Sequence, residues 1–187
     1  MRLLFTIFLF TNFCTAQSRL SEAATSLIHQ KVKYDPAYVV LKYPGGDVPA
    51  NTGVCTDVVI RAYRKIGVDL QKEVHEDMKS NFSAYPGKWG LKATDRNIDH
   101  RRVPNLMTFF ARMGASLPVS LKPEDYEPGN VVSWDLPNNL THIGIVSHKR
   151  SSDGKCLMIV HNIGSGQVLE DVLFAYKITG HYRYKNN

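Results

Sequence analysis

Residues 129–162 read GNVVSWDLPNNLTHIGIVSHKRSSDGKCLMIVHN, and this stretch decides the fold that we predict for the chain. It contains three runs rich in Val and Ile, NVVSWD, HIGIVSH and LMIVHN, which are typical of β-strands. The turn sequence SSDG separates the second run from the third and predicts a hairpin. A fourth run, YKITGHYRY, follows at residues 176–184. We therefore predict an antiparallel meander in the C-terminal part of the chain.

Helical patterns dominate the part that precedes these strands. The spacing of apolar residues predicts helices over residues 19–32, from about Cys55 to Gly67, over residues 70–80 and over Pro104–Met113. In the second of these helices Cys55 lies in the first turn, and Asn51 or Thr52 is the expected N-cap. Helices followed by an antiparallel sheet indicate an α+β fold, with the helices packed on a small sheet or half-barrel.

Two loops interrupt this pattern. Residues 34–53 are rich in Pro, Gly and Asp, and we expect a short strand there only at Tyr38–Leu41. Residues 81–103 form a second long polar segment, and long ordered loops are often functional. The sequence contains no internal repeat, so we expect one domain over residues 17–187.

The first residues, MRLLFTIFLFTNFCTAQS, are typical of an export signal. Arg2 precedes an apolar run, and small residues occupy positions 14 and 16, so we predict a signal peptide over residues 1–16 with cleavage after Ala16. The apolar run is shorter than the roughly 20 residues that span a bilayer, and we expect no stable membrane insertion. A lipoprotein signal acylated at Cys14 is the alternative, but Asn12 and Phe13 stand where such signals have small residues. The expected location is periplasmic or secreted.

The net charge of the chain is +6, and the predicted signal peptide carries one of these positive charges. A modestly basic exported protein suits an anionic partner such as the cell wall. Nucleic acid is not expected as a partner, because no basic-aromatic motif is present. The oligomeric state is left open.

Cys55 has the sequence context of a nucleophile. A thiol ionises more readily at the start of a helix and beside an imidazolium ion. The mature chain keeps a second cysteine, Cys156, so a disulfide between the two is the alternative in an oxidising compartment.

Strand alternation selects His142 and His161 among the seven histidines of the chain. Residues on alternate positions of a strand share a face, and a hairpin with its tip at Ser151-Ser152 places these two histidines directly opposite each other. A tip at Asp153-Gly154 instead places His161 opposite Val146, on the same face. In both cases the pattern predicts a Cys-His-His triad with His142 as the base and His161 orienting it.

These motifs resemble the NlpC-type peptidoglycan peptidases of the papain superfold. In that family a cysteine at a helix start is followed by a strand histidine and then by a third polar residue, often histidine. The string PGNVV at residues 128–132, HIGIV and IVHN carry the resemblance, which implies the roles given above for Cys55, His142 and His161. The chain departs from the family at residues 54–57, which read VCTD where Asp-Cys-Ser-Gly is usual.

A second resemblance covers nearly the whole mature chain. The strings GGDVPANTGVCTDVVIRAYR, NIDHRRVPNL and LFAYKITGHYRY are similar to a bacterial periplasmic family of unassigned function. The NlpC resemblance implies hydrolysis of an amide bond in the peptide stems of peptidoglycan, with those stem peptides as the partner. Acyl transfer through the same thioester stays open as an alternative.

Peptidoglycan stems carry free carboxylates, which the guanidinium groups of Arg101 and Arg102 fit. The expected substrate-binding residues are Tyr43, Asp57, His100, Arg101 and Arg102. Asp57 also lies four residues before Arg61, a spacing typical of a structural helix pair, and the arginines of residues 95–102 can pair with aspartates in the same run.

We expect no metal and no cofactor. Cys55, His142 and His161 are suitable zinc ligands, but no HxxxH or CxxC pair fixes two ligands locally. The remaining hypothesis comes from another class of protein: a module that binds the cell wall without cleaving it, with residues 81–103 as its recognition loop.

Overall fold

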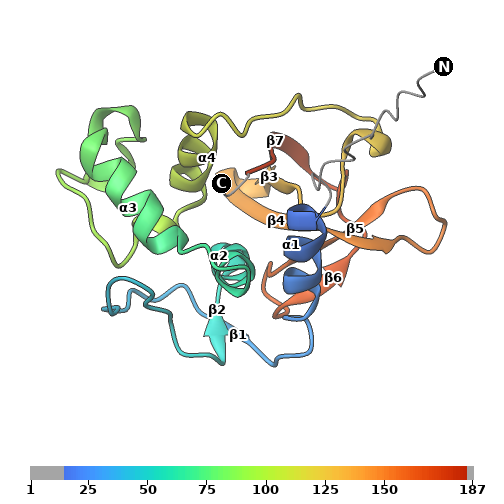
Figure 1. Cartoon of the computed structure of the whole chain (residues 1–187), viewed down its shortest axis with the longest axis horizontal. Coiled ribbons are helices and arrows are strands. Elements are labelled where there is room, and N and C mark those ends of the chain that lie inside the picture. Colours follow the sequence, from blue (N-terminus) through green and yellow to red (C-terminus); the bar gives the residue numbers. More distant parts are fainter. Residues whose placement is uncertain (1–14, 185–187) are drawn as a thin grey trace, which may run out of the picture.

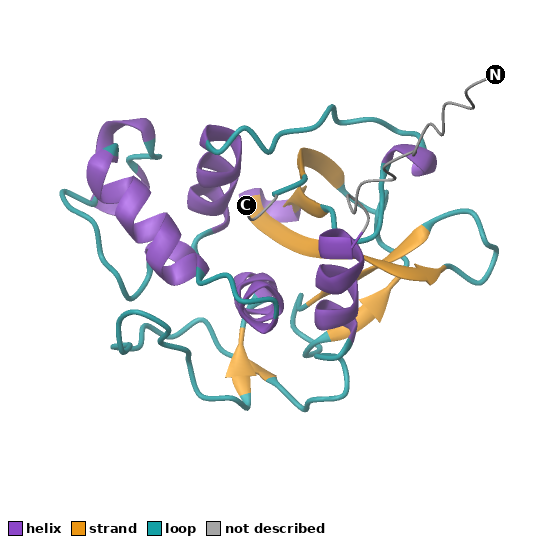
Figure 2. Cartoon of the chain, in the orientation of Figure 1, coloured by secondary structure: helices purple, strands orange, loops and turns teal. Residues whose placement is uncertain are grey.

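Helices and sheet are separate layers of the molecule (Figures 1 and 2). The computed structural model describes residues 15–184. The helices are α1 (Thr15–Thr25), α2 (Cys55–Lys65), α3 (Leu70–Ser80) and α4 (Val103–Arg112). The strands are β1 (Lys33–Tyr34), β2 (Thr52–Gly53), β3 (Val131–Leu136), β4 (Leu140–Arg150), β5 (Leu157–His161), β6 (Val168–Glu170) and β7 (Lys177–Tyr182). The predicted α+β class is confirmed.

The main sheet has the strand order β6-β5-β4-β3-β7, and every neighbouring pair in it is antiparallel. Strands β3, β4 and β5 form the first three strands of the predicted meander. The fourth predicted strand, β7, returns to the free edge of β3, and β6 pairs with β5 in its place. The two-residue strands β1 and β2 pair in parallel beside α2, apart from the main sheet (Figure 1).

The two faces of the sheet bury different sets of apolar residues. Ile143 and Ile145 of β4 lie in one cluster with the buried faces of α1 and α2, as strand alternation requires. Val146 belongs to a second cluster on the opposite face, around the fully buried Trp134 of β3. Because each face is covered, β4 is the central strand of the core, and α2 lies directly against it.

Three local predictions are corrected by the structure. The described chain has no strand at Tyr38–Leu41, because side chains of the segment 95–97 bind this stretch instead: the Leu41 amide donates to Asn97 at 2.9 Å. Helix α1 ends at Thr25 and not at residue 32, since the amides of Leu27, Ile28 and Gln30 bond to carbonyls only three residues back. The N-cap of α2 is Val54, because Thr52 pairs in β2.

The hairpin of β4 and β5 has its tip at Asp153-Gly154, one of the two predicted positions, since Arg150 pairs with Leu157. The register then shifts between Val146 and Arg150, so that Ile145 opposes Val160. In this register His161 lies opposite Gly144. A hairpin with the same tip and no register shift would place His161 opposite Val146, two residues farther from His142. Strand β6 was not predicted, because it is only three residues long and follows a Gly- and Ser-rich turn.

Of the signal-peptide prediction, residues 1–14 lie outside the described residues, and the expected cleavage site after Ala16 falls within α1. Within residues 15–184, no helix combines the length and the apolar character that a membrane crossing requires.

Candidate active site

Cys55 is the first residue of α2, and only 7% of its surface is exposed. Burial raises the pKa of its thiol to about 12, and the neighbouring Asp57 adds to this effect. The backbone N–H groups of Ile143, Thr56 and Cys55 itself act in the opposite direction, because they stabilise a negative charge on the sulfur. At neutral pH the resting sulfur is therefore a thiol surrounded by backbone donors.

Asp57 holds this helix start in place. Its Oδ2 accepts the Val54 amide at 2.7 Å, which caps the helix from inside the first turn. Its two oxygens also bind the guanidinium of Arg101, at 2.9 Å for Nε and 3.1 Å for Nη2. Both side chains are almost fully buried. The N-terminus of α2 is thus anchored by a fork-shaped ion pair.

Further contacts hold the loop before Cys55 against α2 and join it to the main sheet. Gly53, at φ +156°, lies so close to Asp57 that an added Cβ would approach the Asp57 Cβ to 3.2 Å. The carbonyl of Gly53 accepts from Asn162 Nδ2 at 3.1 Å, which joins the loop before Cys55 to the end of β5. The sulfur itself meets the amide of Ile143, the residue directly after His142.

His142, His161 and Glu170 form a hydrogen-bonded chain, called here the histidine relay. His142 Nε2 lies 2.9 Å from His161 Nδ1, and His161 Nε2 lies 2.9 Å from an oxygen of Glu170 on β6. Both histidines are buried, whereas the Glu170 side chain is 44% exposed. The relay therefore runs from His142, whose neighbour in sequence Ile143 meets the Cys55 sulfur, to solvent.

The buried histidines of the relay are neutral at pH 7. Burial, reinforced by His161, lowers the pKa of His142 to about 3. Burial also lowers the pKa of His161, although Glu170 opposes this shift. The ring of Trp134 lies 5.8 Å from that of His142 and excludes water from this side.

A cavity of about 230 Å³ opens beside Cys55. Its wall consists of Tyr34, Pro36, Val54, Cys55, Thr56, Trp89, Ile98, Arg101, Arg102, Val103, Pro104 and Thr141. The guanidinium of Arg102 stacks on Trp89, 4.1 Å from the ring centre. Within residues 15–184, Arg102 Nη1 is buried and has no hydrogen-bond partner. The cavity thus combines a thiol, two aromatic rings and an unsatisfied cationic donor.

The predicted substrate-binding residues separate into two groups. Arg101 and Arg102 line the cavity, and Asp57 stands behind Arg101. His100 is buried elsewhere, and burial lowers its pKa to about 3. Tyr43 lies away from the cavity, with its ring against His75 of α3 at 5.3 Å.

Arg61 binds Asp47 at 2.9 Å, and Asp57 binds Arg101. These two pairs replace the expected helix pair of Asp57 and Arg61.

Cys55 and Cys156 are both free, and the structure has no disulfide between them.

Sequence reasoning missed three residues of the site: Tyr34, Trp89 and Glu170. Tyr34 lies beside Cys55, and burial raises the pKa of its phenol. Trp89 has a left-handed backbone (φ 65°), which is rare for a tryptophan. No periodic pattern identifies any of these residues, because each lies in an element of only two or three residues. The aromatic residues of the long polar segments were the only available signal.

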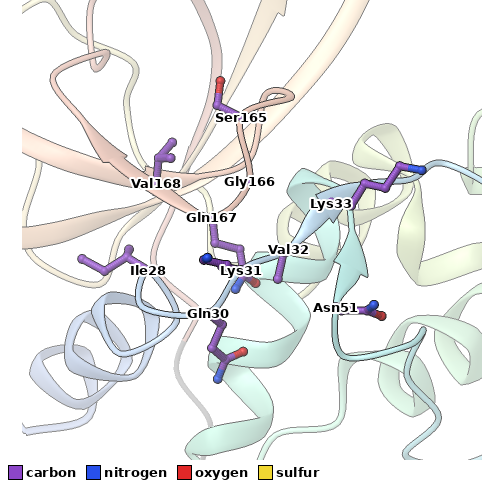
Figure 3. Close-up of a pocket in the computed structure, with 10 residues that line it drawn as sticks. All are labelled: Ile28, Gln30, Lys31, Val32, Lys33, Asn51, Ser165, Gly166, Gln167 and Val168. Atoms are coloured by element: carbon purple, nitrogen blue, oxygen red, sulfur yellow. The ribbon is translucent and has the colours of Figure 1, made fainter.

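A larger cavity, of about 640 Å³, lies on the other side of β1 (Figure 3). The segment after α1 and the loop between β5 and β6 form its walls, with Ile28, residues 30–33, Asn51 and residues 165–168. Gly166 lies against the Val32 carbonyl, to which an added Cβ would come within 2.9 Å. The lining contains no thiol, imidazole or carboxylate, so the hydroxyl of Ser165 has no imidazole or carboxylate base among the lining residues. Among the described residues, no cluster of His, Cys, Asp and Glu is suited to a metal ion.

Comparisons with solved structures give distant similarities. The chain aligns with NlpC1 from Trichomonas vaginalis over 91% of its own length and 45% of that chain, with 13% identity and a TM-score of 0.48. It therefore spans less than half of that protein. An N-acetylmuramoyl-L-alanine amidase from Bacteroides uniformis gives 12% identity and a TM-score of 0.49, over 90% of this chain and 99% of the other.

Sequence comparison gives a much nearer relative. The uncharacterized protein YijF of Escherichia coli (strain K12) is 56% identical over 165 residues, which are 88% of this chain and 80% of the relative. Residues 21–184 match the family described as Domain of unknown function (DUF1287), a range that includes Cys55 and the whole histidine relay. The chain is therefore a member of the DUF1287 family.

Proposed function

We propose that the chain is an exported cysteine hydrolase that cleaves an amide bond in the peptide stems of peptidoglycan. Cys55 is the nucleophile, His142 the general base, and His161 orients His142. The observation that carries this proposal is the position of the Cys55 sulfur against the amide of Ile143, next to a histidine that is hydrogen-bonded to a second histidine. The NlpC-like order of these residues in the sequence supports the choice of substrate.

The reaction proceeds through a thioester. His142 takes the thiol proton as the sulfur attacks the carbonyl carbon of the substrate amide, and the carbonyl electrons move to oxygen. Collapse of this tetrahedral intermediate breaks the C–N bond, and His142 returns the proton to the leaving amine. His142 then deprotonates a water molecule, which attacks the thioester and releases a carboxylic acid and the Cys55 thiol.

The resting site contains no preformed thiolate–imidazolium ion pair. The thiol and the imidazole are both neutral at rest, since their pKa values are shifted to about 12 and about 3. Charge therefore develops only during the attack, where the backbone donors at the start of α2 stabilise it. His142 acts as a base during the attack and not as a preformed imidazolium.

The cavity beside Cys55 supports a substrate with a carboxylate near the scissile amide. Arg102 supplies a buried donor without a partner, and Trp89 holds its guanidinium flat. Arg101 already binds Asp57, so we assign this pair to the support of the helix start. We therefore assign no contact with substrate to Tyr43 or His100.

An amine in place of water would make the same thioester an acyl-transfer intermediate, and the masses of the products distinguish the two reactions. We also propose that residues 1–16 are a signal peptide and that the mature protein acts in the periplasm or outside the cell. The sequence features of an export signal support this location.

Digestion of purified muropeptides tests the proposal. The wild-type chain is expected to release cleaved peptides between pH 5 and 9, whereas Cys55→Ala releases none and Cys156→Ala is fully active as the matched control. A protein that binds muropeptides but leaves them intact in every variant would instead be a wall-binding module, and the hydrolase proposal would be wrong.

A further inference from the structure

Glu170 ends the histidine relay at the surface of the sheet. Its Oε2 lies 2.9 Å from His161 Nε2, and its side chain reaches this position from β6. We propose that Glu170 is a positioning residue that fixes the protons on both histidines, so that His142 carries its hydrogen on Nε2 and leaves Nδ1 unprotonated. This inference rests on the proposed function only for its catalytic consequence. The proton pattern itself is a property of the free protein.

The first step follows from the carboxylate. A glutamate carboxylate can only accept hydrogen bonds. The contact of 2.9 Å therefore requires a hydrogen on His161 Nε2. Among the causes that set the protonation of His161, Glu170 is the charged neighbour that acts on it.

The second step passes this constraint to His142. A neutral imidazole carries one N–H, so Nδ1 of His161 is an acceptor once Nε2 holds the hydrogen. The contact of 2.9 Å between the rings then requires that His142 Nε2 donates. His142 is also neutral, because burial and His161 keep its pKa low. Its Nδ1 is consequently left with a free lone pair, as a general base requires.

The register of the hairpin makes this arrangement possible. Gly144 stands opposite His161, and a Cβ added there would lie 3.1 Å from the Cβ of His161. With no side chain between them, the two rings lie edge to face, 5.1 Å between centres. The Cys55 sulfur of α2 meets the amide of Ile143, the residue after His142, and Glu170 of β6 binds His161 directly. Of these two groups, Glu170 is the one that hydrogen-bonds the pair.

Removal of the carboxylate releases the constraint. In Glu170→Ala, water replaces the carboxylate and can donate to or accept from His161 Nε2, so both tautomers of each histidine become populated. Glu170→Gln offers a carbonyl oxygen to the same N–H and keeps the pattern without the charge. Asp171→Asn, at the exposed neighbouring position, is the matched control for loss of one negative charge.

Imidazole 15N NMR of the free protein at pH 7 tests the proton pattern. The wild type, Glu170→Gln and Asp171→Asn are expected to show His142 Nδ1 at the shift of an unprotonated nitrogen and Nε2 protonated. Glu170→Ala is expected to show averaged shifts. A wild-type spectrum with the hydrogen on His142 Nδ1, or no change in Glu170→Ala, would overturn the inference.

Turnover of muropeptides provides the second readout. We expect kcat to fall about 10- to 100-fold in Glu170→Ala, with partial recovery in Glu170→Gln and no change in Asp171→Asn. If the expected tautomers are observed but the wild type cleaves no muropeptide, the inference about Glu170 stands and the proposed function fails. Full activity in Glu170→Ala together with averaged shifts would contradict the positioning role.

Discussion

The buried pair of Asp57 and Arg101 is expected to contribute more to stability than any other single ion pair at the site. Their side chains are 3% and 2% exposed, and Asp57 also caps α2 through Val54. Removal of one partner of such a pair leaves an unpaired buried charge and costs about 3–5 kcal/mol. Asp57→Ala loses the cap as well, which adds about 1 kcal/mol.

The double variant separates these contributions. In Asp57→Ala/Arg101→Ala no buried charge is left unpaired, so the loss of unfolding free energy should be smaller than the sum of the two single losses by about 2 kcal/mol or more. Urea denaturation of the four proteins at pH 7.5 measures the cycle. Arg112→Ala is the matched control, because Arg112 pairs with Asp77 at the surface of α4 and α3. Single losses below 1 kcal/mol, or strict additivity, would refute the anchoring role of this pair.

Three further predictions concern the relay and the cavity. Gly144→Ala should destabilise the fold by about 1–3 kcal/mol and impair turnover, since the new Cβ would meet an Ile159 methyl group at 2.7 Å; calorimetry and the muropeptide assay test this, and an unchanged melting temperature would contradict it. The lowered pKa of His142, about 3 against 6.5 in the unfolded chain, means that the unfolded state binds the proton as pH falls below 6.5. The free energy of unfolding should thus drop by about 2 kcal/mol between pH 7.5 and pH 5. In His142→Gln the free energy of unfolding, measured by urea denaturation, should depend less on pH. Arg102→Ala should raise KM for carboxylate-bearing stems at least 10-fold while Lys92→Ala, on the same loop, leaves it unchanged; equal KM values in both variants would exclude Arg102 from binding.

The sheet was predictable from sequence because its strands carry strong apolar runs of β-branched residues. The helices of residues 70–80 and 104–113 were also predicted closely, since a polar face and a buried face alternate with helical period. The ends of α1 and the N-cap residue of α2 were not predicted, because hydrogen bonds to distant loops and to β1 determine where these helices begin and end. Local patterns contain no information on such partners.

The residues of the candidate site also separate into those that local sequence patterns predict and those that contacts between distant segments decide. Cys55, His142 and His161 follow from their places on a helix start and on two neighbouring strands. The approach of His161 to His142 depends on a register shift in the hairpin, and the contact of His161 with Glu170 depends on a three-residue strand. The partners of the arginines depend on how the long loops fold back, so the sequence named Arg101 and Arg102 without distinguishing the structural residue from the one that faces the cavity.

The most direct test of the central claim is mass spectrometry of the protein quenched with acid during muropeptide turnover. The proposal predicts that the wild type gains the mass of the acyl part of the cleaved stem, on the peptide that contains Cys55, and that Cys55→Ala gains none. Cleavage that persists in Cys55→Ala, or an acyl group found on any other residue, would contradict the assignment of Cys55 as the nucleophile.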